Sequence, residues 1–191
     1  MQVTVDGFLG GRLRLAQPKT GYRAGIDPVL LAAACPAQSG QEVLELGCGV
    51  GVASLCLGRR VPGLGLNGVE ILGEYAQIAR ENSVRNSIQF DVRQGDVSAR
   101  PTPFFDRSFH HVIMNPPYFS ADASSISPEA GRASGRSEQV ALSHWVDMAA
   151  KRLRPKGYLT VIQRVERLAD LLVALEGCLG SIVVQPLASR A

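Results

Sequence analysis

The sequence predicts an α/β fold in which helices cover both faces of a mostly parallel, doubly wound sheet. Three observations lead to this prediction. Short apolar segments of strand length alternate with longer segments of helical spacing, a glycine-rich turn joins one strand to its helix, and polar residues follow the strands. The 191 residues are enough for one well-filled core, so we predict a single domain over 1–191, with an N-terminal extension (1–40) and a core (41–191).

The N-terminal extension is predicted to contain a hairpin and a helix. VTVDGFLGGRLRLAQ has the pattern of two short strands joined at Gly10 and Gly11. In the following DPVLLAAAC, Asp27 is the expected N-cap of a helix and Pro28 its first helical residue.

The core is predicted to alternate strands and helices. It begins with the strand EVLELGCG (42–49) and the helix VASLCLGRR, which Pro62 ends. Further strands are expected at 64–70, 88–96, 110–115, 158–163 and 181–187, and further helices at 72–86, 138–153 and 165–178. Because the carboxyl ends of parallel strands meet at one edge, the residues that follow the strands should line one ligand-binding crevice.

The composition excludes several classes of protein. With 46% hydrophobic and 19% charged residues, the chain has the composition of a soluble globular protein. Its longest apolar run, PVLLAAAC, is shorter than the ~20 residues that cross a bilayer, and MQVTVDG does not resemble a secretory leader, so we expect a cytoplasmic protein. The cysteines show no spacing typical of metal ligands, so no metal site is expected: they are Cys35, Cys48, Cys56 and Cys178.

Basic residues gather in two places, although the net charge is only +3. One group precedes residue 25 and the other is KRLRPK at 151–156. Such groups can contact a polyanion such as RNA, although a solvated surface is the commoner role of a charge run. The candidates in the first group are Arg12, Arg14, Lys19 and Arg23.

The glycine turn GCGVG is the first candidate for binding a ligand. Gly47, Gly49 and Gly51 let the backbone turn sharply and approach a nucleotide-like ligand at the start of the next helix. Val52 stands where a dinucleotide-binding motif would need its third glycine, which disfavours NAD. The alternative is that the glycines serve only the geometry of the turn.

Two acidic residues end the next two strands. Glu70 lies about twenty residues after the glycine turn, where a carboxylate can accept hydrogen bonds from both hydroxyls of a ribose. Asp96 follows Gly95 and could accept a hydrogen bond from an adenine amino group. The alternatives are an exposed strand-end glutamate without a role and an aspartate that caps its own turn.

The segment MNPPYF (114–119) follows the predicted strand at 110–115. Each proline lacks an amide hydrogen and restricts the residue before it, so Asn115, Pro116 and Pro117 form a rigid segment with free carbonyls. The Asn115 side-chain oxygen and the Pro116 carbonyl can accept both hydrogens of a planar amino group, on whose ring Tyr118 can stack. The alternative is a stiff turn that leaves the sheet.

Taken in this order, LELGCGVG, GVE, QGD and MNPPYF resemble the class I S-adenosylmethionine-dependent methyltransferases that modify exocyclic or amide nitrogens. The stretch GGRLRLAQPKTGYRAGIDPVLLAAACP is similar to the small-domain family that includes the bacterial tRNA(Val) adenine-37 N6-methyltransferases. The resemblance implies a Rossmann-like fold with a seven-stranded sheet, of which we expect the final antiparallel strand to be missing here. It also implies cofactor contacts for the following residues: Glu45, Gly47, Cys48, Gly49, Gly51, Glu70, Asp96 and Asn115.

We therefore expect an N-methyltransferase that acts on the exocyclic amine of a nucleobase, with adenine N6 in tRNA favoured and Asn115 to Tyr118 as the catalytic segment. The alternatives are an rRNA guanine-N2 enzyme, a protein-glutamine N5 enzyme, and a non-catalytic S-adenosylmethionine-binding module that helps to bind RNA. Arg132 and Arg136, in the Ser/Ala/Gly-rich stretch after the catalytic segment, join the candidate RNA contacts. We expect neither a metal nor a membrane partner, and a monomer or weak dimer.

Overall fold

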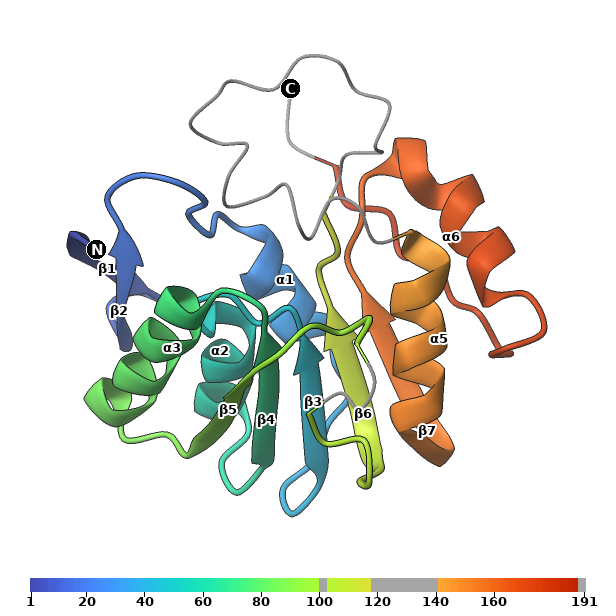
Figure 1. Ribbon diagram of the computed structural model, residues 1–191, viewed down its shortest axis with the longest axis horizontal. Helices are drawn as coiled ribbons and strands as arrows, with labels where there is room; N and C mark the ends of the chain where they lie inside the picture. The colour runs from blue at the N-terminus through green and yellow to red at the C-terminus, as the bar shows by residue number, and fades with distance from the viewer. Residues whose placement is uncertain (100–102, 118–140, 189–191) are drawn as a thin grey trace.

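A computed structural model describes residues 1–99, 103–117 and 141–188. Its central sheet has five strands in the order β5-β4-β3-β6-β7 (Figure 1). Each neighbouring pair is parallel, which confirms the prediction of a parallel sheet. The strands are β3 (Glu42–Leu46), β4 (Gly65–Glu70), β5 (Phe90–Gln94), β6 (Phe109–Met114) and β7 (Leu153–Val161).

Helices cover both faces of this sheet. Alternation along β6 shows the two faces, because Ile113 belongs to one buried cluster while Val112 and Met114 belong to the other. Residues of α1, α2 and α3 complete the first cluster, and residues of α5 and α6 complete the second. The helices are α1 (Asp27–Ala34), α2 (Val52–Arg60), α3 (Gly73–Asn86), α5 (Leu142–Arg152) and α6 (Leu168–Leu175), with a 3₁₀ turn, η1 (Val165–Arg167), before α6.

The N-terminal hairpin is formed as predicted, by β1 (Val3–Phe8) and β2 (Leu13–Pro18), and lies beside α3 (Figure 1). Two asparagine side chains of α3 hold it there. Asn82 Oδ1 accepts the Ala16 N–H at 2.7 Å and Asn82 Nδ2 donates to the Ala16 carbonyl at 3.0 Å. Asn86 makes the same pair of bonds with the backbone of Arg14, both at 2.9 Å. The two side-chain amides thus bond to backbone groups of β2 that a third strand would otherwise pair with.

Three local predictions were wrong. α1 begins at Asp27 itself, and its N-cap is Ile26, which makes no side-chain capping bond. β7 begins at Leu153 directly after α5, because Leu153 pairs with Phe109 of β6 although Pro155 and Gly157 follow. Residues 181–187 form no strand, since no described strand pairs with them, and Val183 is 87% exposed.

Two further properties concern the described residues alone. No described helix has the length and apolar character needed to cross a bilayer. No three His, Cys, Asp or Glu side chains in the described ranges gather where they could hold a metal ion.

Candidate active site

The glycine turn joins β3 to α2 at the carboxyl edge of the sheet. Gly47, Gly49 and Gly51 have φ values of 68°, 54° and 86°, in the left-handed region that favours glycine. A Cβ on Gly47 would lie 2.8 Å from Trp145, and one on Gly51 would lie 2.9 Å from Phe90. A Cβ on Gly49 would meet nothing within 4 Å, so Gly49 is the glycine that faces open space.

Strand register brings the other predicted residues to the same edge. Leu46 pairs with Met114 and with Val69, so Gly47 and Asn115, which follow their strands, lie beside Glu70, the last residue of β4. The Gly95 N–H donates to the Glu70 carbonyl at 2.9 Å, which brings the end of β5 to this edge as well. Gly47, Glu70 and Asn115 therefore lie at one edge of the sheet, and the ligand-binding crevice expected there stays a prediction.

Glu70 is buried beside the glycine turn. Its Oε2 accepts the Gly49 N–H at 2.8 Å and its Oε1 accepts the Leu72 N–H at 2.9 Å. Burial raises the pKa of this carboxyl, while these backbone hydrogen bonds lower it. Each oxygen keeps a lone pair for a further donor, so the carboxylate can support the turn and accept ligand hydroxyls together. The ribose contact itself stays a prediction.

Glu45 and Cys48 lie behind the turn rather than at its open side. Glu45 Oε2 accepts the Ser54 N–H at 3.0 Å, which ties β3 to the first turn of α2. Burial raises the Glu45 pKa to about 8, against the opposing effect of Ser54, so the carboxyl keeps its proton at neutral pH. The Cys48 thiol is buried against Gly68, and burial raises its pKa. Their predicted cofactor contacts remain untested.

Asp96 caps its own turn. Its Oδ1 accepts the Ser98 N–H at 2.7 Å and the Ser98 hydroxyl at 2.6 Å. This is the alternative that the sequence left open, and it accounts for one oxygen of the carboxylate. A contact between Asp96 and an adenine stays a prediction.

The proline segment presents a buried acceptor at the end of β6. Asn115 Oδ1 is buried, and no described residue donates a hydrogen bond to it. Buried polar atoms in proteins are nearly always paired, so an unpaired one at a ligand-binding edge suits a ligand donor. The Pro116 carbonyl accepts the side-chain N–H of Gln163 at 3.4 Å. Tyr118 lies outside the described residues.

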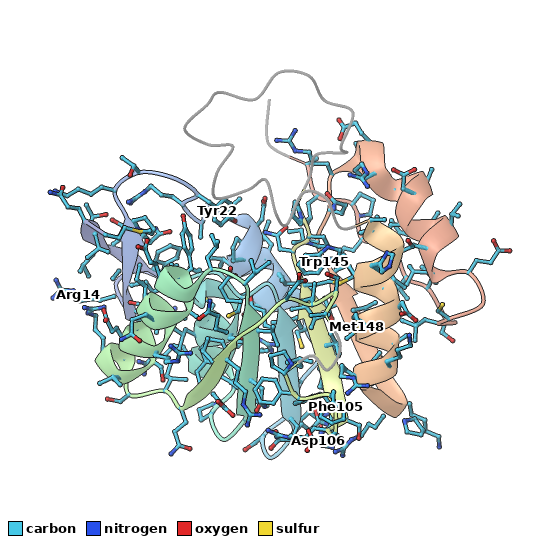
Figure 2. The ribbon with its side chains drawn as sticks, in the orientation of Figure 1. Arg14, Tyr22, Phe105, Asp106, Trp145 and Met148 are labelled. Carbon is cyan, nitrogen blue, oxygen red and sulfur yellow. The ribbon has the colours of Figure 1, made fainter. Side chains whose placement is uncertain are left out.

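Four of the six basic residues predicted to contact RNA are described, and they lie on or next to the hairpin. Arg12, Arg14 and Lys19 are exposed on or next to the hairpin, and Figure 2 shows Arg14 well away from Trp145. Arg23 is tied to the hairpin, because its guanidinium pairs with Asp6 at 2.5 Å and donates to the Pro18 carbonyl. Arg132 and Arg136 lie outside the described residues. The RNA-contact roles of all six stay predictions.

Two residues of the site were missed by sequence reasoning. Gln163 follows β7 and holds the Pro116 carbonyl, and the rule that residues after strands line the crevice could have found it. Trp145 lies on α5, and its side chain is 4% exposed. Its ring also packs against Gly47, and its Nε1 has no acceptor among the described residues. No sequence signal distinguishes this tryptophan from an ordinary core residue.

The residues of this edge fit S-adenosylmethionine. Gly49 leaves room for a ligand against its backbone, Glu70 can accept hydroxyl groups, and Asn115 offers an acceptor beside them. A parallel α/β sheet with this glycine turn and proline segment at its carboxyl edge defines a class I methyltransferase, a class whose cofactor is S-adenosylmethionine.

Solved structures agree on the fold. A protein from Agrobacterium tumefaciens described as a predicted O-methyltransferase superposes with a TM-score of 0.60 at 24% identity, over 78% of this chain and 67% of that one. TrmN from Thermus thermophilus gives a TM-score of 0.60 at 18% identity, over 78% of this chain and 40% of that one.

The chain belongs to the methyltransferase small domain family, whose model matches residues 24–184. It is 31% identical over 175 residues to a tRNA1(Val) (adenine(37)-N6)-methyltransferase of Porphyromonas gingivalis, covering 87% of this chain and 68% of the relative. It is 30% identical over 163 residues to the enzyme of the same name from Erwinia tasmaniensis, covering 82% of this chain and 64% of the relative. The chain thus spans about two thirds of the length of these relatives.

Proposed function

We propose that this protein transfers a methyl group from S-adenosylmethionine to the exocyclic N6 of an adenine in tRNA. Family membership and the names of the relatives support this reaction. The single observation that carries the proposal is the buried Oδ1 of Asn115, which receives no hydrogen bond from any described residue and precedes two prolines at the carboxyl end of β6.

Asn115 and Pro116 would hold the target amine. An exocyclic amine is a poor nucleophile because its lone pair is delocalised into the ring. Two acceptors, Asn115 Oδ1 and the Pro116 carbonyl, can bind its two hydrogens and favour the tetrahedral nitrogen of the transition state. The methylated nitrogen then loses one proton to water, so the segment needs no strong base.

Gln163 would position the Pro116 carbonyl. A carbonyl oxygen has two lone pairs, and the bond from Gln163 Nε2 uses one of them. Gln163 is itself held, because its Oε1 accepts the Arg164 N–H at 2.9 Å. The second lone pair stays available to the substrate amine.

The opposite wall of the crevice would hold the cofactor, which when bound supplies an electrophilic methyl group on a sulfonium. Gly49 lets the backbone approach it, and Glu70 fixes the Gly49 amide and can accept ribose hydroxyls. Glu45 supports this arrangement from behind by anchoring the start of α2. Tyr118 would provide the ring on which the base stacks.

Three other functions are weaker candidates. A protein-glutamine enzyme or a guanine-N2 enzyme would present a similar amine or amide to Asn115, but the relatives are named for an adenine in tRNA. A non-catalytic RNA-binding module would have no need for a buried acceptor at residue 115 that no described residue satisfies.

The test is to incubate the protein with tritiated S-adenosylmethionine and total cellular RNA, digest the RNA to nucleosides and identify the labelled one. Labelled N6-methyladenosine from the tRNA fraction supports the proposal, and this role would place the protein in the cytoplasm. Labelled N2-methylguanosine, label in a protein glutamine, or cofactor binding without any transfer would each refute it.

A further inference from the structure

A pocket lies at the opposite edge of the sheet from the candidate active site. It has a volume of about 370 Å³, and six of its lining residues are Gln41, His110, His111, Arg154, Lys156 and Tyr158. These residues stand at or near the amino ends of β3, β6 and β7. His110 and Asn115 are five residues apart along β6, or roughly 16 Å at the rise of a strand, so the two sites are separate.

A bulge in β7 forms one wall of this pocket. Phe109 pairs with Leu153 and His111 pairs with Tyr158, so residues 154–157 of β7 stand opposite His110 alone. Within the bulge Lys156 adopts a φ of 65°, which is uncommon for a residue with a side chain. Bulges and strained backbone concentrate where a strand must redirect side chains for function.

The bulge contains Arg154 and Lys156 of KRLRPK, and neither has a carboxylate partner in the described structure. Lys151 pairs with Asp147 at 2.5 Å, and Arg152 donates to the Phe104 carbonyl at 3.1 Å. Arg154 and Lys156 form no ion pair with any described residue, and no carboxylate lines the pocket. Two positive charges in a pocket without a counter-charge favour an anion.

His110 adds a third donor. Its Nδ1 is 2.9 Å from the Glu42 N–H and its Nε2 is 2.6 Å from Arg154 Nη1, so both ring nitrogens face donors. A neutral imidazole has only one acceptor nitrogen. Because the Glu42 amide is fixed in β3, Nδ1 accepts from it and the ring proton is on Nε2. Two donors, His110 and Arg154, then face each other, and an anionic oxygen that accepts from both would relieve this contact.

The remaining wall is aromatic. The rings of His111 and Tyr158 stack with centroids 5.7 Å apart and an angle of 13° between their planes. His111 Nε2 lies 2.8 Å from Gln41 Oε1, and that oxygen also accepts the Gln38 N–H, so the histidine donates. Burial lowers the pKa of His111, which keeps this ring neutral. Tyr158 is 61% exposed and offers its outer face to a planar ring.

We propose that this pocket binds the phosphate of a nucleotide, either free or within RNA, through Arg154, Lys156 and His110, with Tyr158 beside the base. Three converging donors suit the oxygens of a phosphate, and an exposed tyrosine next to them suits a nucleobase. The proposal does not depend on the reaction at the carboxyl edge, since the binding is measured without S-adenosylmethionine and without methyl transfer.

The first experiment titrates the isotopically labelled protein with inorganic phosphate and follows its amide and imidazole resonances by NMR. We expect shifts centred on His110, His111 and Tyr158, with a Kd in the millimolar range. The double variant R154Q/K156Q should weaken binding at least tenfold, and K151Q, from the same basic run, should leave it unchanged. Shifts located elsewhere, or equal binding by R154Q/K156Q, would overturn the proposal.

The second experiment separates the two sources of phosphate. Tighter binding of AMP than of inorganic phosphate, lost in Y158A, supports a free nucleotide. If RNA is the source, the slope of log K against log salt for a single-stranded RNA should fall by about 1.4 in R154Q/K156Q, at ~0.7 for each lost phosphate contact. If neither AMP nor RNA binds more tightly than inorganic phosphate, the assignment to a nucleotide is wrong. These substitutions leave the residues of the carboxyl edge unchanged. The outcome of the N6-methylation test is therefore independent of the binding results.

Discussion

Replacing Asn115 by alanine should separate activity from stability. Asn115 Oδ1 is buried and has no donor among the described residues, so N115A removes no hydrogen bond that those residues make to this oxygen. Leaving a buried acceptor unpaired costs ~1–3 kcal/mol, and the substitution removes this cost. We therefore expect the free energy of unfolding to stay the same or to rise by about 1 kcal/mol.

The effect on catalysis should be much larger. If Asn115 Oδ1 binds the amine more tightly in the transition state than in the ground state, its loss removes one preorganised hydrogen bond from a site shielded from water. Such a loss costs about 10²–10³-fold in kcat, or ~3–4 kcal/mol. Cofactor affinity should change only a few-fold, because Gly49 and Glu70 remain in place.

Three measurements on the same preparation test this expectation: tritium transfer to a tRNA transcript, denaturant unfolding, and calorimetric titration with S-adenosylmethionine. N67A is the matched control, because Asn67 lies at the amino end of β4 and its Nδ2 donates to Glu42 Oε2 at 3.1 Å and to the carbonyls of Val43 and Gly65. N67A should lose about 2–4 kcal/mol of stability while the folded fraction keeps its kcat.

The outcome that would refute this reasoning is a kcat of N115A within about threefold of the unmodified protein, which corresponds to less than ~0.7 kcal/mol of transition-state stabilisation. A clear loss of stability in N115A, equal to that of N67A, would show instead that Asn115 is a structural residue.

Three further predictions follow from the site. Burial raises the pKa of Glu45 from an ordinary 4.5 to about 8 in the folded protein. The free energy of unfolding should therefore fall as pH rises through this interval, by up to ~1.4 kcal/mol per pH unit. The variant E45Q should remove this slope in unfolding titrations from pH 5 to about 9. G51A should unfold at a lower denaturant concentration than G49A, because both have a strained backbone but only the new Cβ of G51A also meets a side chain. G49A should instead weaken S-adenosylmethionine binding in calorimetry. If G49A were the less stable variant and G51A the weaker binder, the assignment of Gly49 to the ligand side would be wrong. Charge reversal of Arg12 and Arg14 should raise the Michaelis constant for tRNA and reduce its salt dependence, whereas an unchanged salt slope would exclude the hairpin from the RNA contacts.

The edge that carries the site could be predicted because it follows from topology. Once alternating strands and helices are recognised, a parallel sheet places the residues after its strands together, and the pairing of Leu46 with Met114 does this for Gly47 and Asn115. The glycine turn could also be predicted locally, since Gly47, Gly49 and Gly51 occupy the positions of this turn that have positive φ.

The features that could not be predicted depend on partners distant in sequence. Residues 181–187 have the apolar character of a strand, but a strand also needs a neighbour, and none of the described strands supplies one. Pro155 and Gly157 are typical of a helix stop, yet the pairing of Leu153 with Phe109 continues the chain as β7 with a bulge. Arg23 belonged to a basic group, and only the hairpin brings Asp6 to it.

Asn82 gives the hairpin and the glycine turn a common support. Its Nδ2 donates to the carbonyl of Ala16 in the hairpin and to that of Val50 in the glycine turn, each at 3.0 Å, and the side chain is fully buried. One amide therefore couples the position of the hairpin to that of the turn. If the turn binds the cofactor as we propose, a macromolecule that displaces the hairpin should also alter the affinity for S-adenosylmethionine.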